Sequence, residues 1–378
     1  MTAHVDEAAF RDRTERVQRA LADADADLAV LFPSSNLHYV AGFDEEPAER
    51  HLFLFVPRDG DPVFVVPSLY ESQVRAESWV DGVHAYADSD DPMTVVEDVL
   101  DEVLWGVDGK PRVLVDDSMW ATFTQDLREA VPGASWGLAS EALEPVRVRK
   151  DDAELAALRE AGRVADAVSE WVRARDEAVV GMTEAELAGE IERELRERGA
   201  TGLAFPVIVG SGPNGAMPHH THGERVVERG DPVVLDFGGF VDDYPGDQTR
   251  TVVFAGDPPD EFERVHDVVR EAQQAGVDAV EPGVEAQAVD AAAREVIADA
   301  GYGDAFVHRT GHGVGLDVHE PPYVVAGNDR ELEPGMVCSI EPGVYLDGAF
   351  GVRIEDLVVV TEDGCERLNH SDRGWRTP

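Results

Sequence analysis

The sequence predicts an α/β (α+β) protein of two domains, the second built from two similar halves. The chain has 378 residues, 43% of them hydrophobic, which is enough for two separate cores. Short apolar runs alternate with helical patterns up to about residue 140. Beyond that point, a helix-helix-strand order occurs twice, which indicates an internal duplication.

The first domain is predicted from apolar runs at residues 28–32, 52–56, 63–66 and 113–115, which alternate with helical stretches. Pro145 is expected to end a helix, and a basic cluster that ends at Lys150 follows it. We therefore expect domains at 1–147 and 148–378.

The second domain is predicted to contain two pairs of helices. Apolar residues recur at helical spacing over 151–178, and Thr183 with Glu186 forms a capping box for a second helix that ends near Gly199. A second pair is expected over about 260–279 and 286–299, ending at Gly301.

The duplication is clearest in two segments, 230–238 and 335–343. Each has a glycine six residues before an acid and another glycine two residues after it; the acids are Asp236 and Glu341. Each segment then turns and returns with a second acid, Asp247 in the first half and Glu355 in the second. Two hairpins would thus present four carboxylates.

The expected hairpin geometry brings these acids together. A first hairpin centred between Val241 and Asp242 would place Asp236 opposite Asp247, and a second centred on Gly348 would present Glu341 and Glu355 in the same way. Buried like charges repel and lose hydration, so four clustered carboxylates require cations. Two divalent metals about 3.5–4 Å apart would balance them.

Histidines occur in two clusters. His308, His312 and His319 fall within one segment, and glycines on both sides of His312 allow close approach of backbone and metal. A second cluster comprises His219, His220 and His222. We expect His219, His312 and His319 in the site and structural roles for His220 and His222.

Composition excludes several classes of function. Acidic residues outnumber basic ones 77 to 32, for a net charge of −45, which argues against nucleic acid and anionic membranes as partners. Only Lys110 and Lys150 are lysines; such a surface suggests a salt-rich cytoplasm. Cys338 and Cys365 lack CxxC spacing, and no signal peptide or membrane-spanning run is recognised, so we expect a soluble cytoplasmic protein.

Several motifs resemble one known family. Segments 235–238, 247–251, 311–320, 339–345 and 353–356 are similar to those of the pita-bread metallopeptidases, the family of aminopeptidase P, prolidase, methionine aminopeptidase and creatinase. The resemblance covers about 205–358, with weaker similarity at 147–161 and 36–43. It implies an N-terminal creatinase-like α/β domain followed by a pita-bread domain.

The resemblance also implies a site. Its metal ligands would be Asp236, Asp247, His312, Glu341 and Glu355, holding two divalent ions. A ligand set dominated by carboxylates favours manganese, with cobalt, iron or zinc as substitutes. A hydroxide bridging the metals would attack the scissile carbonyl, and Glu341 would take the water's proton. His219 and His319 would donate hydrogen bonds to substrate and oxyanion, and His308, Tyr345 and Arg353 would line the site and bind substrate.

The length of the chain favours the two-domain branch of this family, which cleaves before proline. We therefore expect a peptide substrate, Xaa-Pro aminopeptidase or dipeptidase activity and a homodimer, in which His38, Tyr39 or Arg50 could reach a neighbouring site. The sequence leaves open whether the enzyme is a dipeptidase or an aminopeptidase P. Two alternatives remain: a metal-dependent hydrolase or lyase of a small molecule such as ectoine, and a non-catalytic peptide-binding protein.

Overall fold

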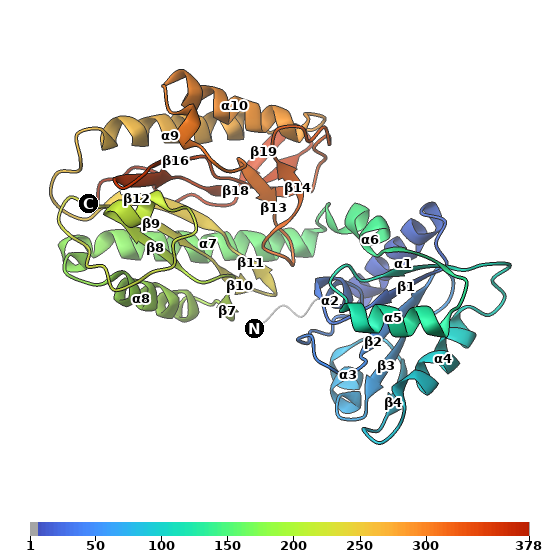
Figure 1. Cartoon of the computed structure of the whole chain (residues 1–378). Coiled ribbons are helices and arrows are strands. Elements are labelled where there is room, and N and C mark those ends of the chain that lie inside the picture. Colours follow the sequence, from blue (N-terminus) through green and yellow to red (C-terminus); the bar gives the residue numbers. More distant parts are fainter. Residues whose placement is uncertain (1–6, 378) are drawn as a thin grey trace. The chain divides into compact units, whose positions relative to one another are not determined.

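The computed structural model describes residues 7–377. Contacts divide the chain into two compact units, Met1–Arg147 and Val148–Pro378, each with its own core (Figure 1).

The first unit contains a mixed six-stranded sheet in the order β4-β3-β2-β1-β5-β6. Strand β2 pairs antiparallel with β1 and β3, and the remaining pairs are parallel. The predicted apolar runs are confirmed as strands. The strands are β1 Leu28–Leu31, β2 Phe53–Pro57, β3 Val63–Pro67, β4 Gly82–Tyr86, β5 Arg112–Val115 and β6 Ser135–Leu138.

Helices flank this sheet, and one of them corrects a sequence prediction. Pro145 does not end a helix, because α6 includes it and continues to Arg147. The missing amide and the ring of proline disfavour a helix interior, and α6 extends only two residues beyond it. The helices are α1 Glu7–Asp23, α2 Ser35–Ala41, α3 Glu71–Glu77, α4 Pro92–Val103, α5 Ala121–Ala130 and α6 Ser140–Arg147.

The second unit contains the two predicted pairs of long helices. The capping box of Thr183 and Glu186 is confirmed, and Asp151 with Glu154 forms another at the start of α7. Helix α7 ends earlier than the predicted residue 178, because a 3-10 turn, η1 Asp176–Val179, follows it. The pairs are α7 Asp152–Ala174 with α8 Glu184–Glu197, and α9 Phe262–Asp278 with α10 Ala286–Asp299.

The strands of the second unit form two main sheets, ordered β12-β9-β8 and β14-β13-β15-β18-β19, beside a β16-β17 hairpin and a small β11-β10-β7 sheet. In the first half they are β7 Gly202–Leu203, β8 Ile208–Ser211, β9 Pro232–Phe237, β10 Gly239–Val241, β11 Tyr244–Pro245 and β12 Gln248–Val253. In the second half they are β13 Gly311–Gly313, β14 Glu320–Val324, β15 Val337–Ile340, β16 Gly343–Leu346, β17 Phe350–Arg353, β18 Asp356–Thr361 and β19 Gly364–Arg367. Short 3-10 turns, η2 Gly212–Ala216 and η3 Gly303–Ala305, complete the unit.

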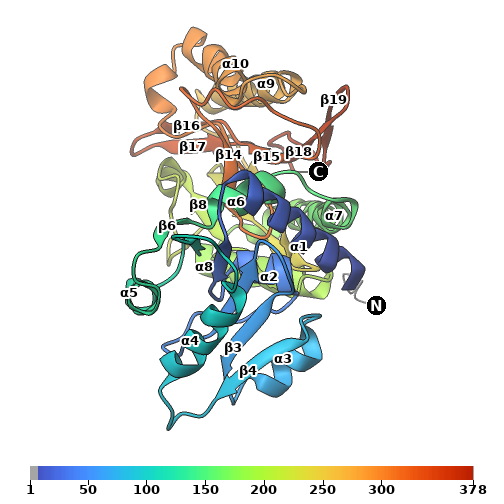
Figure 2. The same ribbon diagram turned by 90° about the vertical axis from the view of Figure 1, so that its right-hand side faces the viewer.

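These strands lie between the helix pairs, with α9 and α10 on one side and α7 and α8 on the other (Figures 1 and 2). Apolar residues of α7 and α8 pack with Leu235 of β9, and Phe262 of α9 packs with Val352 of β17. Because each helix pair covers the outer face of its strands, the inner faces of the strands in the two halves are left to build a common site. This is the duplicated pita-bread arrangement.

Strand register confirms one predicted pairing and corrects the other. Ile340 pairs with Asp356 and Gly343 with Arg353, which places Glu341 opposite Glu355 as predicted. In the first half, however, Asp236 pairs with Thr249, not with Asp247.

The shift arises at the turn of the first hairpin. Val241 pairs with Tyr244 across Asp242 and Asp243, which both have positive φ, 46° and 67°, as a two-residue type I′ turn requires. Asp247 lies two residues before Thr249, so it remains on the same face as Asp236, as a diagonal neighbour.

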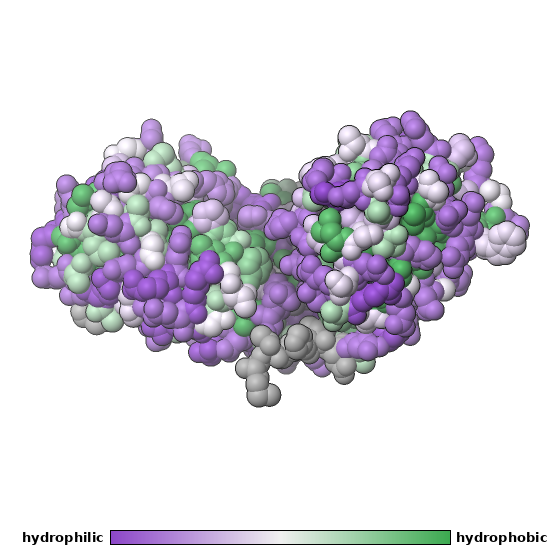
Figure 3. Space-filling model, turned by 90° about the horizontal axis from the view of Figure 1, so that it is seen from below, coloured by the Kyte–Doolittle hydropathy of each residue, from purple (hydrophilic) through white to green (hydrophobic). Residues whose placement is uncertain are grey.

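Hydrophilic residues predominate on the face of the molecule seen in Figure 3, in keeping with the acidic composition. Among residues 7–377, none of the helices combines the length and the apolar character needed to cross a bilayer.

Candidate metal centre

A pocket of about 530 Å³ lies in the second unit. It is lined by every site residue predicted from the sequence except Tyr345. The lining residues are Phe205, Pro206, Ile208, Pro218, His219, Thr221, Asp236, Asp247, His308, Arg309, His312, Val318, His319, Glu341, Arg353 and Glu355.

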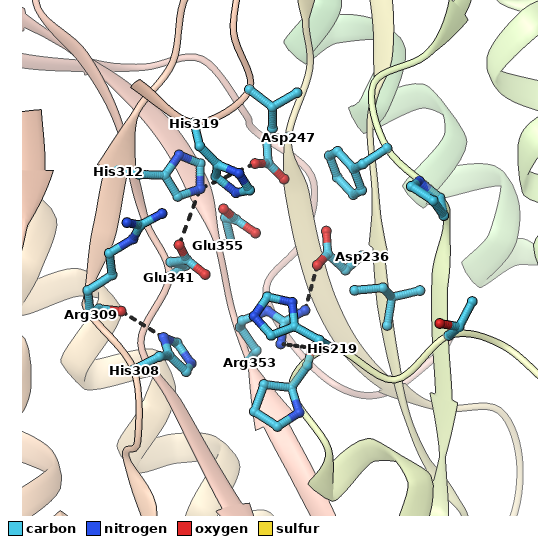
Figure 4. Close-up of a pocket in the computed structure, with 16 residues that line it drawn as sticks. His219, Asp236, Asp247, His308, Arg309, His312, His319, Glu341, Arg353 and Glu355 are labelled. Atoms are coloured by element: carbon cyan, nitrogen blue, oxygen red, sulfur yellow. Dashed lines mark hydrogen bonds and ion pairs between the residues drawn. The ribbon is translucent and has the colours of Figure 1, made fainter. Parts of the chain in front are cut away.

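Both halves of the duplication contribute side chains to this pocket (Figure 4). Asp236 lies on β9 and Asp247 directly before β12, in the first half. His312 lies on β13, Glu341 directly after β15 and Glu355 directly before β18, in the second half. All five side chains face one central space (Figure 4).

Distances within this group suit shared cations. His312 Nε2 lies 3.4 Å from Glu341 Oε1 and 3.7 Å from Asp247 Oδ2. Asp247, His312 and Glu355 each offer one ligand atom, and these atoms lie within 4.8 Å of one another. Oδ1 of Asp236 is buried without a hydrogen-bond partner, an arrangement that a cation would satisfy.

The raised pKa values of the clustered carboxyl groups also favour bound cations. Burial, and then the charges of neighbouring acids, raise the pKa of Asp247 and the pKa of Glu355 well above their ordinary values. Burial also raises the pKa of Glu341 to about 7, although Arg353 opposes this shift. Such a group of buried acids is stable in its charged form only beside compensating positive charge, so the donor set fits divalent cations.

His312 is suited to ligation by its protonation state and orientation. Burial, followed by the charge of His319, lowers the pKa of His312 to about 3, so the imidazole is neutral. Its Nδ1 lies 3.1 Å from the carbonyl oxygen of Gly313, which can only accept a hydrogen bond. Nδ1 is therefore the donor, and Nε2 is left as the basic nitrogen that faces the carboxylates.

Arg353 lies in the pocket wall with its guanidinium engaged by the protein. Its Nη2 donates to Asp236 Oδ2 at 2.5 Å, and its Nε donates to Thr249 Oγ1 at 3.0 Å. Nη1 donates to the hydroxyl of Tyr345 at 3.0 Å and to the carbonyl of Pro218 at 3.3 Å. Arg353 therefore links the carboxylate of Asp236 to the segment that precedes His219.

The other two histidines of the 308–319 segment contact different neighbours. His319 lies against His312, with ring centroids 4.3 Å apart, and burial followed by Arg309 lowers the pKa of His319. His308 Nε2 bonds the hydroxyl of Tyr345 at 2.8 Å, and burial lowers the pKa of His308 to about 4. Tyr345 thus lies behind the pocket surface, between His308 and Arg353.

His220 and His222 have protein partners outside the pocket lining. His222 Nδ1 donates to the carbonyl of Val207 at 2.7 Å, and His220 Nε2 lies 2.8 Å from Glu184 Oε2. Glu184 is fully buried and also accepts from the backbone and side chain of Ser211 and from Asn214. This acid therefore organises the loop that carries His219.

Sequence reasoning missed one residue that lines the pocket, Arg309, and two that support it, Glu184 and Thr249. Glu184 is the first residue of a predicted helix, where an acid is common without a functional role. Thr249 follows the predicted ligand Asp247 by two residues, and its own side chain was given no role. Arg309 lines the pocket with its guanidinium 4.5 Å from the ring centroid of Tyr323. Arg309 could have been predicted as a pocket residue, because it lies between His308 and His312 in the sequence.

The proposed contacts of the first unit are corrected in part. Tyr39 is fully buried inside this unit, with the Arg13 guanidinium 4.8 Å from its ring centroid, so its ring cannot reach a neighbouring molecule. Arg50 pairs with Asp88 and Glu49 at the surface.

The comparisons with known proteins agree with this geometry. Residues 156–362 match Metallopeptidase family M24, and residues 13–149 match the Creatinase/Prolidase N-terminal domain. The chain belongs to metallopeptidase family M24. The expected order of a creatinase-like domain and a pita-bread domain is thereby confirmed.

Relatives within family M24 extend over nearly the whole chain. The probable dipeptidase PepE of Mycobacterium tuberculosis is 43% identical over 365 residues, covering 93% of this chain and 92% of that protein. The Xaa-Pro dipeptidase of Lactobacillus helveticus is 36% identical, covering 95% and 97%. The crystal structure of dipeptidase PepE from Mycobacterium ulcerans is 40% identical, with a TM-score of 0.90 and 99% coverage of both chains. The M24 family is one of metal-dependent peptidases, and this chain retains a candidate metal site.

Proposed function

We propose that this M24 protein is a two-metal peptidase that cleaves Xaa-Pro dipeptides, releasing the residue before proline. The observation that carries the proposal is the convergence of four carboxylates and one neutral imidazole in a single pocket. The names of its relatives, dipeptidase and Xaa-Pro dipeptidase, favour the substrate class.

Asp236, Asp247, His312, Glu341 and Glu355 would hold the two cations. Ligands that are mainly carboxylate oxygens favour manganese, with cobalt, iron or zinc as substitutes. When bound, the cations would supply Lewis acidity toward the scissile carbonyl and lower the pKa of the attacking water.

The chain's own groups would manage protons and orientation. Glu341 would accept the proton of the attacking water, since its carboxylate lines the pocket and lies 3.4 Å from the imidazole of His312, beside the other ligand atoms. His319 and His219 line the pocket and would donate hydrogen bonds to the substrate and to the developing oxyanion. Arg353 would hold Asp236 in place, because its guanidinium is already engaged by four protein groups.

Arg309 favours a dipeptide over a longer peptide. It lines the pocket, and none of the described carboxylates forms an ion pair with it. A dipeptide carries its free carboxylate one residue beyond the scissile bond, where a cation in the same pocket would bind it. A longer peptide has a neutral amide there.

The test compares hydrolysis of Ala-Pro, Ala-Pro-Ala and Ala-Ala by the manganese-loaded and the chelated protein in buffer of high ionic strength. We expect metal-dependent cleavage of Ala-Pro, slower cleavage of Ala-Pro-Ala and almost none of Ala-Ala. Arg309→Met should raise KM for Ala-Pro by about tenfold or more, as expected for loss of a charge-assisted contact. The exposed Arg193→Met serves as the control.

Other outcomes would replace this proposal. Equal cleavage of Ala-Ala removes the proline specificity, and preference for Ala-Pro-Ala makes the enzyme an aminopeptidase. Metal binding without peptide cleavage would favour a small-molecule substrate such as ectoine. Peptide binding without bound metal would indicate a non-catalytic protein.

We further propose domains at 1–147 and 148–378 and a homodimer. Light scattering at several protein concentrations tests the dimer, and a mass of about one chain at all of them would refute it.

A further inference from the structure

Lys150 stands apart from the other basic residues of the chain. Only Lys110 and Lys150 are lysines among 32 basic residues, the rest being arginine. Lys110 is exposed at the surface, whereas the side chain of Lys150 has 0% exposure. One of the two lysines in a lysine-poor chain is therefore fully buried, where an ammonium group is costly to place.

The buried ammonium has one charged partner. Lys150 Nζ lies 2.6 Å from Oε1 of Glu320, whose side chain is 8% exposed, and 3.4 Å from the carbonyl of Val148. Neither Lys150 nor Glu320 is among the residues that line the metal pocket. A buried ion pair is weak evidence for a stabilising role, because desolvation offsets most of the attraction. This pair therefore calls for another explanation.

Glu320 is joined directly to a residue of the pocket. It is the first residue of β14, opposite Gly313 of β13, and His319 immediately precedes it. Successive side chains near a strand point to opposite faces, so His319 faces the pocket while Glu320 faces Lys150.

The loop that carries His319 is also folded around the Glu320 carboxylate. A Cβ placed on Gly315 would lie 2.3 Å from Glu320 Oε1, so only glycine permits this approach. Gly315 N–H donates to the carbonyl of Asp317 at 3.0 Å, which closes the loop on itself. The loop of residues 314–319 thus packs directly against the Glu320 carboxylate at Gly315.

Lys150 itself is fixed to the framework of the second unit. Its N–H donates to the carbonyl of Gly335 at 2.8 Å, and the adjacent Arg149 forms a β-bridge with Met336. Asp151, the next residue, caps α7. The ammonium therefore offers a rigid point to which the His319 loop can be attached.

We propose that Lys150 is a positioning residue, acting through Glu320, that holds His319 in its place beside His312. The inference rests on the proposed function, in which His319 contacts the substrate. A compact ammonium on a flexible stem suits this enclosed position beside one carboxylate.

The test uses Lys150→Met, Glu320→Gln and the double variant. Each single change removes one charge of the buried Lys150–Glu320 pair and keeps the other, so melting temperature should fall by roughly 5–15 °C, and the double variant should recover most of that loss. In all three, kcat for Ala-Pro should fall at least about tenfold, because a displacement near 1 Å is enough for such losses. Metal content should stay at the wild-type value.

Recovery of kcat together with stability in the double variant would overturn the proposal, because a purely structural pair predicts both. So would single variants that retain wild-type kcat. Arg149→Met is the matched control: the neighbouring Arg149–Glu333 pair is about half exposed on both sides, and its removal should change neither quantity.

A readout independent of turnover separates this inference from the proposed function. The imidazole ¹H–¹⁵N signals of His319, identified by their loss in His319→Gln, should shift or broaden in the double variant and stay unchanged in Arg149→Met. If the wild type cleaves no Xaa-Pro peptide, the proposed function fails, but shifted His319 signals still support positioning. Unshifted signals refute it.

Discussion

The hydroxyl of Thr249 donates a hydrogen bond of 2.7 Å to Oε2 of Glu355, across the boundary between the two halves of the second unit. Both residues are buried. Thr249 faces Asp236 in the first half, as Glu355 faces Glu341 in the second. The two residues thus occupy equivalent positions of the duplication, and one half supplies a hydrogen-bond donor to the carboxylate of the other.

Replacing Thr249 by valine should weaken metal binding. The change removes the donor to Glu355 and the acceptor of Arg353 Nε without changing the size of the side chain. We expect metal affinity or kcat to fall by about 10–100-fold, as for other residues that orient metal ligands. Metal titration and steady-state kinetics measure this, and Thr249→Ser, which keeps the hydroxyl, should stay near wild type. Equal losses in both variants would contradict the hydrogen-bond argument.

Chelated protein should become less stable as pH rises from about 4.5 to about 7. The pKa of Glu341 is raised from 4.5 to about 7, so the folded state keeps a proton that the unfolded state has released. The free energy of unfolding then falls by up to about 1.4 kcal/mol per pH unit from this group. Thermal melts of the chelated protein across this range measure the slope.

Glu341→Gln should reduce that slope, which separates Glu341 from the many surface acids that titrate in both proteins. Saturating manganese should remove the loss, because bound cations favour the ionised carboxylates. A slope unchanged by the substitution would show that Glu341 titrates normally.

Glu184→Gln should loosen the loop that carries His219. Glu184 receives hydrogen bonds from Ser211, Asn214 and His220, and a neutral amide cannot accept all of them. We expect a loss of about 1–3 kcal/mol in stability and a raised KM, with bound metal unchanged. Glu197→Gln, on the exposed face of the same helix, is the control. A wild-type KM in Glu184→Gln would show that the loop holds His219 without this acid.

The sequence predicted those features of the site that depend on local spacing. The pairing of Glu341 with Glu355 followed from a turn around Gly348, whose positive φ of 68° suits glycine. The pairing of Asp236 was wrong because the first hairpin turns through two aspartates at positive φ, where no glycine marks the turn.

Contacts between distant segments could not be read from the sequence in the same way. The bond from Thr249 to Glu355 spans 106 residues, and the bond from Arg353 to Asp236 spans 117. Neither leaves a periodic pattern, because each depends on how the two halves pack. For this reason Arg353 was predicted from the sequence to bind substrate, whereas its guanidinium is bonded to protein groups.

Asp247→Asn should remove metal and activity together. The ligand atoms of Asp247, His312 and Glu355 lie within 4.8 Å of one another, and Asp247 is a diagonal neighbour of Asp236 on the same strand pair. A neutral amide offers one weaker oxygen to a hard cation, so bound manganese should fall from about two ions per chain to one or fewer, and kcat by about 100-fold or more. Elemental analysis and Ala-Pro hydrolysis measure the two effects. Asp243→Asn is the matched control, because it makes the same change in the exposed turn of the same hairpin, and asparagine tolerates its positive φ of 67°. If Asp247→Asn kept its full metal content and its activity, the carboxylates would be clustered for a reason other than metal binding.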